Sequence, residues 1–129
     1  MPDGHPASPL PGHGRSVLLV DDDPDWRTWL RDHLEGLGYR VSEVSDGSTA
    51  LEVLEEEAFE LILLDLVMPG LSGEDVARRV GADGPQVVFV TGADGEELAS
   101  AMQTGARYYL PKGATSDHLA LMLHALHLQ

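Results

Sequence analysis

The chain has 129 residues, 43% of them hydrophobic, and its 22 acidic and 8 basic residues give a net charge of −14, which fits one acidic folded domain with a single core. The absence of a lysine- or arginine-rich stripe argues against direct binding to nucleic acid or to an anionic membrane surface. The absence of cysteine excludes a disulfide framework, thiol catalysis and thiolate metal sites, and the absence of a signal peptide or a bilayer-spanning apolar run predicts a cytoplasmic protein.

The first segment, residues 1–15, reads MPDGHPASPLPGHGR and contains four prolines, three glycines and almost nothing to bury. This composition is typical of a flexible tail. His5 and His13 are interpreted as solvated tail residues and not as metal ligands. The folded domain is therefore predicted to occupy residues 16–129.

Two strand–helix pairs follow this tail. Residues 16–20, SVLLV, form an apolar run that predicts a strand. Asp23 and Pro24 are typical of a helix start, and Gly38 is expected to end that helix. Residues 39–44, YRVSEV, alternate as a second strand. The apolar face of a second helix consists of Ala50, Leu51, Leu54 and Ala58.

The middle of the chain predicts a third pair and a fourth strand. Residues 61–64, LILL, read as a strand that is buried on both faces. Ser72 and Asp75 resemble the capping box of a short helix. Residues 86–90, QVVFV, predict another buried strand.

The last part of the chain contains two further helices and a strand. Asp94 and Glu97 are expected to cap a helix, residues 108–110, YYL, predict a fifth strand, and Ser116 opens the final helix. Five strands, each followed by a helix, predict an α/β fold in which helices cover both faces of a parallel sheet.

Functional groups in such sheets lie beyond the carboxyl ends of the strands. The polar residues that fall at these ends are Asp21, Asp22, Asp23, Asp65, Thr91 and Lys112. Asp65 is the most informative of them, because a carboxylate at the end of a buried strand is costly without a partner charge, donors or a metal. We therefore expect Asp65 to point into a polar pocket that these residues share.

Four segments at the strand ends resemble those of the receiver domains of bacterial response regulators, and the resemblance covers residues 16–128. They are VLLVDDDPDWR (17–27), LLDLVMPGLSG (63–73), VVFVTG (87–92) and GARYYLPKG (105–113). The resemblance implies a doubly wound, flavodoxin-like (β/α)5 fold with strand order 2-1-3-4-5. It implies a signalling domain that accepts a phosphoryl group in a two-component phosphorelay, and not an enzyme beyond its own phosphorylation and dephosphorylation.

A cluster of carboxylates is a natural site for a hard divalent cation, because the charges repel one another without it. By resemblance, Asp65 is the phosphoacceptor. Mg²⁺ is the implied cofactor, bound by side-chain oxygens of Asp22 and Asp65 and by the backbone carbonyl of Val67. Asp21 is implied to act mainly through coordinated water.

The resemblance also assigns a switch. Lys112 and Thr91 are implied to contact the phosphoryl oxygens, and movement of Thr91 is implied to let Tyr109 turn inward. A plain core aromatic is the alternative for Tyr109. Pro111 precedes the lysine and Gly113 follows it, where the family commonly has a proline after the lysine, and the lysine is still expected in the pocket.

The implied partners are a sensor histidine kinase or a histidine phosphotransfer protein, and an effector. Because the sequence stops at Gln129 as the last helix ends, output is expected through a partner or through sequence outside this chain. The last helix has one apolar stripe, with further leucines beside it, so it is either well buried or part of a face for an effector or homodimer. The stripe is Leu119, Met122 and Leu126, and the leucines beside it are Leu121, Leu123 and Leu128.

Two other functions are weighed against phosphoryl acceptance. The first is a receiver-fold binding module that is never phosphorylated. The second is a Mg²⁺-dependent phosphatase of the haloacid dehalogenase type, disfavoured because Pro24 follows its second aspartate and Asp65 has no role in it. The residues it would use are Asp21, Asp23, Thr91 and Lys112. A Ca²⁺ loop over residues 21–32 is rejected, because Trp26 stands where such a loop requires glycine.

Overall fold

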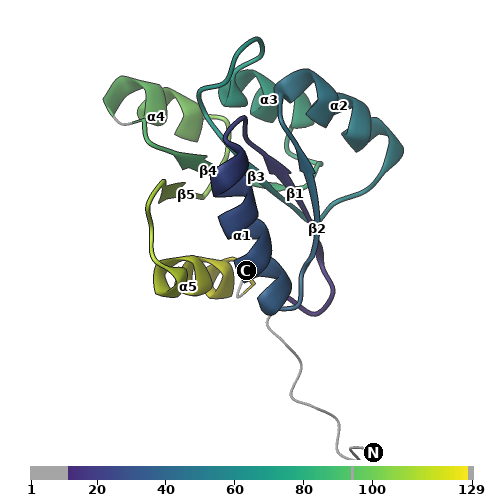
Figure 1. Cartoon of the computed structure of the whole chain (residues 1–129). Coiled ribbons are helices and arrows are strands. Elements are labelled where there is room, and N and C mark those ends of the chain that lie inside the picture. Colours follow the sequence, from purple (N-terminus) through teal and green to yellow (C-terminus); the bar gives the residue numbers. More distant parts are fainter. Residues whose placement is uncertain (1–11, 94, 128–129) are drawn as a thin grey trace, which may run out of the picture.

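The computed structural model describes residues 12–93 and 95–127. Its strands form one sheet in the order β2-β1-β3-β4-β5, all parallel, and a helix follows each strand (Figure 1). The strands are β1 (Ser16–Val20), β2 (Arg40–Val44), β3 (Leu61–Leu64), β4 (Gln86–Thr91) and β5 (Tyr108–Pro111). The helices are α1 (Pro24–Gly36), α2 (Gly47–Glu56), α3 (Gly73–Val80), α4 (Gly95–Met102) and α5 (Ser116–His127). The predicted α/β fold and strand order are confirmed.

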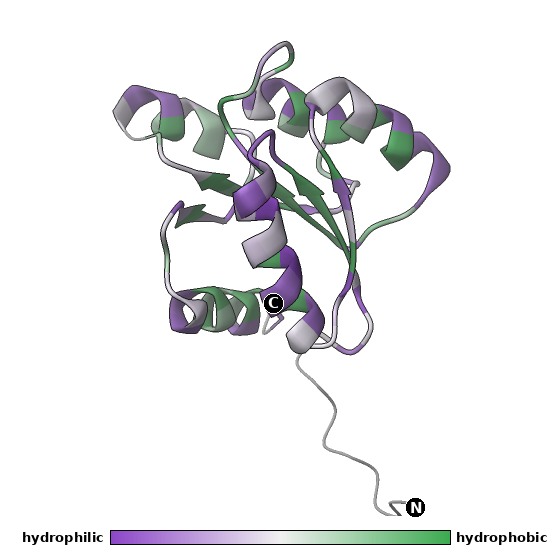
Figure 2. Cartoon of the chain, viewed as in Figure 1, coloured by the Kyte–Doolittle hydropathy of each residue, from purple (hydrophilic) through white to green (hydrophobic). Residues whose placement is uncertain are grey.

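Hydrophobic side chains cover both faces of the sheet, because successive residues of a strand point to opposite sides. In β1, Val17 and Leu19 pack with α1 and α5, whereas Leu18 and Val20 pack with α2, α3 and α4. Figure 1 shows the two helical layers on either side of the sheet, and Figure 2 shows the central strands as strongly hydrophobic. Such burial on both faces is usual for parallel sheets.

Two of the predicted helix starts, those of α1 and α3, are present as hydrogen-bonded caps. The Asp23 carboxylate accepts hydrogen bonds from the N–H groups of Asp25 and Trp26 at 3.0 and 3.3 Å, ahead of Pro24 at the first helical position. Ser72 and Asp75 exchange both hydrogen bonds of a capping box at the start of α3, which is 8 residues long. Among the described residues, no helix combines the length and hydrophobicity needed to cross a membrane.

One predicted helix boundary is confirmed and another differs from the structure. Helix α1 ends at Gly36 with Leu37 as its C-cap, and Gly38 follows at a φ of +94°, so the glycine predicted to end this helix does so in a conformation that it adopts without a steric penalty. Helix α2 ends at Glu56, so Ala58 lies in the loop that leads to β3, because the backbone is already extended at Glu57. Asp94, which was predicted to cap α4, lies outside the described residues.

Part of the predicted N-terminal tail falls within the described residues. The N–H of Gly12 donates to the carbonyl of Leu37 at 2.7 Å, and the N–H of Gly14 donates to the carbonyl of Gly38 at 2.8 Å. Residues 12–15 therefore lie against the turn between α1 and β2. Residues 1–11 lie outside the described part, and the domain boundary at residue 15 stays a prediction.

Candidate functional site

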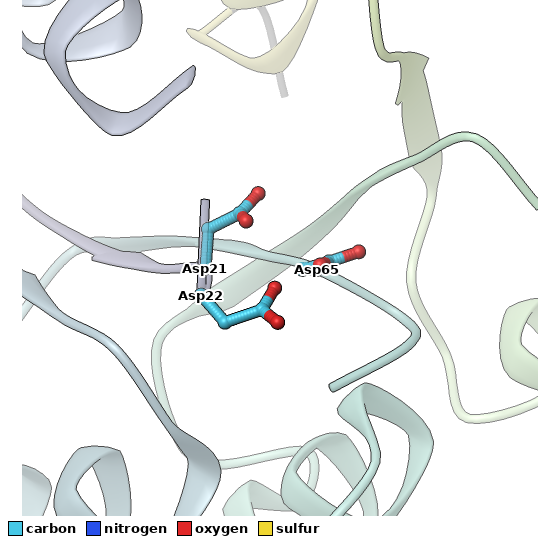
Figure 3. Close-up of side chains that lie close together, drawn as sticks. All are labelled: Asp21, Asp22 and Asp65. Atoms are coloured by element: carbon cyan, nitrogen blue, oxygen red, sulfur yellow. The ribbon is translucent and has the colours of Figure 1, made fainter. Parts of the chain in front are cut away.

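Three aspartates meet at the carboxyl edge of the sheet. Asp21 and Asp22 follow β1, and Asp65 follows β3, its parallel neighbour, in which Leu64 pairs with Val20. This register places the first residues after the two strands level with each other. Oxygen atoms of the three carboxylates lie within 4.8 Å of one another, and Figure 3 shows the side chains gathered there.

Two of these carboxylates are buried. Asp21 is 2% exposed and Asp65 is 4% exposed, whereas Asp22 is exposed to solvent. Burial, followed by repulsion from Asp21, raises the pKa of Asp65 to about 6, although Lys112 and the N–H of Val67 act in the opposite direction. The surroundings of Asp65 therefore disfavour the ionised form of its carboxylate.

Lys112 supplies a positive charge to this cluster. Its Nζ atom lies 3.1 Å from Oδ2 of Asp21 and 3.3 Å from Oδ2 of Asp65. Burial lowers the pKa of Lys112, but the hydrogen bond to Asp21 and the charges of Asp65 and Asp21 outweigh it and raise this pKa above its usual value. The lysine is thus charged and lies between the two buried carboxylates, with Gly113 after it at a φ of +90°.

A cavity of about 460 Å³ opens above Asp65. It is lined by Asp22, Asp65, Val67, Thr91, Gly92, Ala93, Glu97 and Lys112. Thr91 is the last residue of β4 and is 2% exposed, and its Oγ1 accepts a hydrogen bond from the N–H of Ala93 at 2.9 Å. The side chain of Val67 is 58% exposed at the rim. The structure therefore brings together the predicted phosphoacceptor, threonine, lysine and valine.

A larger cavity of about 820 Å³ lies at the opposite edge of the sheet, between α2 and α3. Glutamates and apolar side chains line most of it, and neither the aspartate cluster nor Lys112 reaches it. The smaller cavity is the candidate site, because a buried carboxylate and its charge partners meet there.

Tyr109 lies outside the aspartate cluster. It belongs to β5 and is 45% exposed, so the alternative that made it a core aromatic is wrong. Leu119, Met122 and Leu126 of α5 are buried, as their spacing predicted, together with Leu123. Leu121 is 69% exposed, which leaves an apolar side chain on the surface of this helix.

Two residues near the site were not found from the sequence. Glu97 was interpreted only as a helix cap, yet it lines the cavity from α4. Arg27 was read only as part of the acidic motif, yet its Nη1 donates to the carbonyl of Asp21 at 2.5 Å. A local pattern carries no signal for either contact, because each depends on how a helix packs on the sheet.

Comparisons with known proteins agree with this arrangement. The family model described as the response regulator receiver domain matches residues 17–124. The response regulator receiver protein CpdR of Brucella abortus is 41% identical over 80 residues, which cover 60% of this chain and 67% of CpdR. The DNA-binding response regulator MtrA of Mycolicibacterium smegmatis is 37% identical over 111 residues, which cover 84% of this chain and 49% of MtrA. The chain thus spans about half the length of MtrA.

A solved structure gives the same fold. The crystal structure of the receiver domain of the sensor histidine kinase PA1611 from Pseudomonas aeruginosa PAO1 matches with a TM-score of 0.78 and 29% sequence identity. The match covers 87% of this chain and 96% of that chain. A magnesium ion is coordinated in the active site cleft of that domain.

Proposed function

This chain belongs to the family of response regulator receiver domains, the signalling domains of two-component systems, and on that premise we propose that Asp65 is its phosphoacceptor. The observation that carries the proposal is the burial of the Asp65 carboxylate beside Asp21 and Lys112 at the end of β3. One oxygen of Asp65 forms a bond to phosphorus while the bond between phosphorus and the donor's leaving group breaks. The product is an aspartyl phosphate.

The residues present fit a bound Mg²⁺ ion. Their oxygen atoms are the donors that this cation prefers, and oxygen atoms of Asp21, Asp22 and Asp65 lie within 4.8 Å of one another. Side-chain oxygens of Asp22 and Asp65 and the carbonyl of Val67 would hold the ion, with Asp21 acting through a coordinated water. The bound ion supplies positive charge that offsets the charge of the phosphoryl oxygens.

Lys112 and Thr91 supply the remaining contacts to the phosphoryl group. Lys112 pairs with Asp65 Oδ2 at 3.3 Å, so its ammonium lies beside the atom that receives the phosphoryl group and can pair with a phosphoryl oxygen. The Oγ1 atom of Thr91 already accepts a hydrogen bond from Ala93, so its own O–H is the group that donates to a phosphoryl oxygen. Both residues would stabilise the negative charge of the phosphoryl oxygens in the cavity.

The output of this switch is proposed to pass through α4, β5 and α5. Tyr109 is 45% exposed, and it would turn inward when Thr91 moves toward the phosphoryl group. The exposed Leu121 and the outer side of β5 would then bind an effector or a second copy of the chain. The phosphoryl donor would be a sensor histidine kinase or a histidine phosphotransfer protein in the cytoplasm.

Phosphorylation of Asp65 is tested by intact mass. The chain is incubated with Mg²⁺ and acetyl phosphate, and its mass is expected to increase by one phosphoryl group. Asp65→Asn is expected to abolish the increase, because the amide is not a nucleophile of this kind. An increase that persists in this variant would refute the assignment. Label on Asp21 would favour a phosphatase-type site, and no label in the wild type would favour the unphosphorylated binding module.

A further inference from the structure

Arg27 reaches back from the first turn of α1 to the acidic loop that follows β1. Its Nη1 atom donates to the carbonyl oxygen of Asp21 at 2.5 Å, and its Nε atom donates to Oε1 of Glu43 at 2.8 Å. The Arg27 side chain is only 17% exposed. The carbonyl belongs to the peptide that joins Asp21 to Asp22, so Arg27 binds the peptide that carries two of the clustered carboxylates.

The far side of Arg27 is fixed to the edge strand β2. The Glu43 carboxylate also pairs through Oε2 with Nη1 of Arg31 at 3.0 Å, and Nη2 of Arg31 donates to the carbonyl of Val41 at 2.7 Å. Glu43 therefore holds two guanidinium groups at once. Because Glu43 and Val41 belong to a strand of the sheet, this network ties the acidic loop to a rigid element.

Asp21 is constrained from several directions. Its N–H donates to the carbonyl of Val44 at 3.2 Å, and its Oδ1 accepts a hydrogen bond from the N–H of Asp23 at 2.9 Å. Its carbonyl, buried with the rest of the residue, needs a donor, and Arg27 provides one. The Asp21–Asp22 peptide sets the directions of both side chains, and both must face Asp65 for the three carboxylates to meet.

We propose that Arg27 is a positioning residue of the cation site, which orients the Asp21–Asp22 peptide so that both carboxylates face Asp65. The inference rests on the proposed function, because it concerns the same Mg²⁺ site. If Arg27 acted only through its charge, removing it would strengthen Mg²⁺ binding, because a nearby guanidinium repels a cation. Loss of orientation predicts weaker binding. Glu43 neutralises that guanidinium, so the loss of orientation outweighs the loss of repulsion.

The test is a calorimetric titration of the full chain with Mg²⁺ alone. In Arg27→Ala the Kd for Mg²⁺ is expected to rise about tenfold, the size of effect typical of residues that orient metal ligands. Arg31→Ala is the matched control, because it removes the other arginine of Glu43 and leaves the contact to Asp21. Its Kd is expected to change by less than about twofold, as for residues outside the metal's own supporting contacts.

A second variant and a second measurement separate positioning from stability. Arg27→Lys keeps the charge but lacks the planar fork that serves two acceptors, so its Kd is expected between those of the wild type and Arg27→Ala. Thermal unfolding in EDTA is expected to show a larger loss of stability for Arg27→Ala than for Arg31→Ala, because the former leaves the buried Asp21 carbonyl without its donor. Both variants are expected to stay folded at the temperature of the titration, although only Arg27→Ala loses affinity for Mg²⁺. An Arg27→Ala protein that binds Mg²⁺ as tightly as the wild type, or more tightly, overturns this inference alone. A wild type that binds no Mg²⁺ overturns the proposed metal site as well.

Discussion

The Asp65 carboxylate lies in surroundings that favour its protonated form. The residue is 4% exposed, and burial and the neighbouring Asp21 raise its pKa to about 6 against the pull of Lys112. A carboxyl group whose pKa is higher in the folded chain than in the unfolded chain stabilises the fold when protonated. That stability is lost as pH rises from the unfolded pKa through the folded pKa.

Asp65→Asn is therefore expected to stabilise the metal-free protein. The pKa of Asp65 is about 6 in the folded chain and 3.8 as its reference value, so the difference between variant and wild type opens between these values. Above pH 7 the variant is expected to be more stable by about 3 kcal/mol, and below pH 4 about equal. Urea unfolding in EDTA across this range measures it. If the difference in the free energy of unfolding between the two proteins does not depend on pH, ionisation of Asp65 does not destabilise the fold.

The residues at the rim of the cavity bear on the lifetime of the aspartyl phosphate. Val67 and Ala93 line the cavity with Asp65, and neither side chain can hydrogen-bond a water that approaches the phosphorus. We expect a phosphorylated state that decays slowly for this family. Val67→Asn combined with Ala93→Glu is expected to increase the decay rate by at least about tenfold, because positioned polar groups activate water.

Decay of the phosphoryl mass in Mg²⁺ buffer measures this lifetime. Glu97→Gln is the matched control, since Glu97 lines the same cavity and is the one carboxylate that α4 contributes to its lining. A double variant that decays at the wild-type rate would mean that the rim does not govern water access. A large slowing in Glu97→Gln alone would assign that function to α4.

At the scale of elements, the first residue of α3 fixes the loop that carries Asp65. The N–H of Gly73 donates to the carbonyl of Leu66 at 2.9 Å. A Cβ atom at this glycine would lie 2.2 Å from the carbonyl oxygen of Asp65 and 2.8 Å from Cα of Leu66. Both are backbone atoms, so no side-chain movement can relieve the contact. Helix α3 and the loop that carries Asp65 are packed too closely for any side chain between them.

Gly73→Ala is expected to destabilise the chain by about 2 kcal/mol, the usual cost of overpacking, and to slow phosphorylation of Asp65. Gly36→Ala is the matched control, because Gly36 also lies in a helix and its Cβ would meet nothing within 4 Å. That change is expected to stabilise by about 0.5 kcal/mol, since alanine favours helices over glycine. Urea unfolding and the mass assay measure both effects. Equal behaviour of the two variants would contradict the close packing of α3 on the loop.

The elements whose signals are local could be predicted from the sequence. Asp23 with Pro24 marks the start of α1, and Ser72 with Asp75 marks the start of α3, because a cap satisfies backbone groups within a few residues. The placement of Asp65 in a polar pocket was also predictable, because a carboxylate directly after four apolar residues of a buried strand is costly without polar partners.

Contacts between distant segments could not be predicted in this way. Arg27 and Glu43 are 16 residues apart and meet only because α1 packs beside β2. The exposure of Tyr109 was equally open, since an aromatic residue in a strand suits either face until the helices that cover it are placed. Helix α2 ends before Ala58 because the following residues connect it to β3. That connection is set by the position of the strand in the sheet and not by the helix's own sequence.

At the scale of the whole molecule, an acidic protein holds an acidic site. The net charge is −14, and three carboxylates lie within 4.8 Å of one another at one edge of the sheet. Like charges at this spacing oppose folding, and Lys112 offsets only part of that repulsion. A cation that binds only the folded chain should therefore increase its stability.

Mg²⁺ is expected to raise the Tm. At tenfold its Kd, a ligand of the folded state stabilises by about 1.4 kcal/mol, which raises the Tm by about 5 °C for a chain of this length. Asp22→Ala should reduce this Tm shift, because it removes one of the carboxylates proposed to bind the ion. Asp22 is the exposed member of the cluster, so the buried pair, Asp21 and Asp65, stays in place. Thermal scans at constant ionic strength measure the shift, with Na⁺ as the non-specific comparison. An identical shift in both proteins would locate the cation elsewhere.

The two ends of the described chain meet at one place. Gly12 is hydrogen-bonded to Leu37, and His127, the last residue of α5, is hydrogen-bonded to Tyr39 two positions further along the same turn. This turn precedes β2 and Asp65 follows β3, so the two lie at opposite edges of the parallel sheet (Figure 1). The fold is thus suited to domain insertion. If it were inserted into a surface loop of a host protein, its two connections to the host would lie at neighbouring points. Its aspartate edge would face outward, open to a phosphodonor.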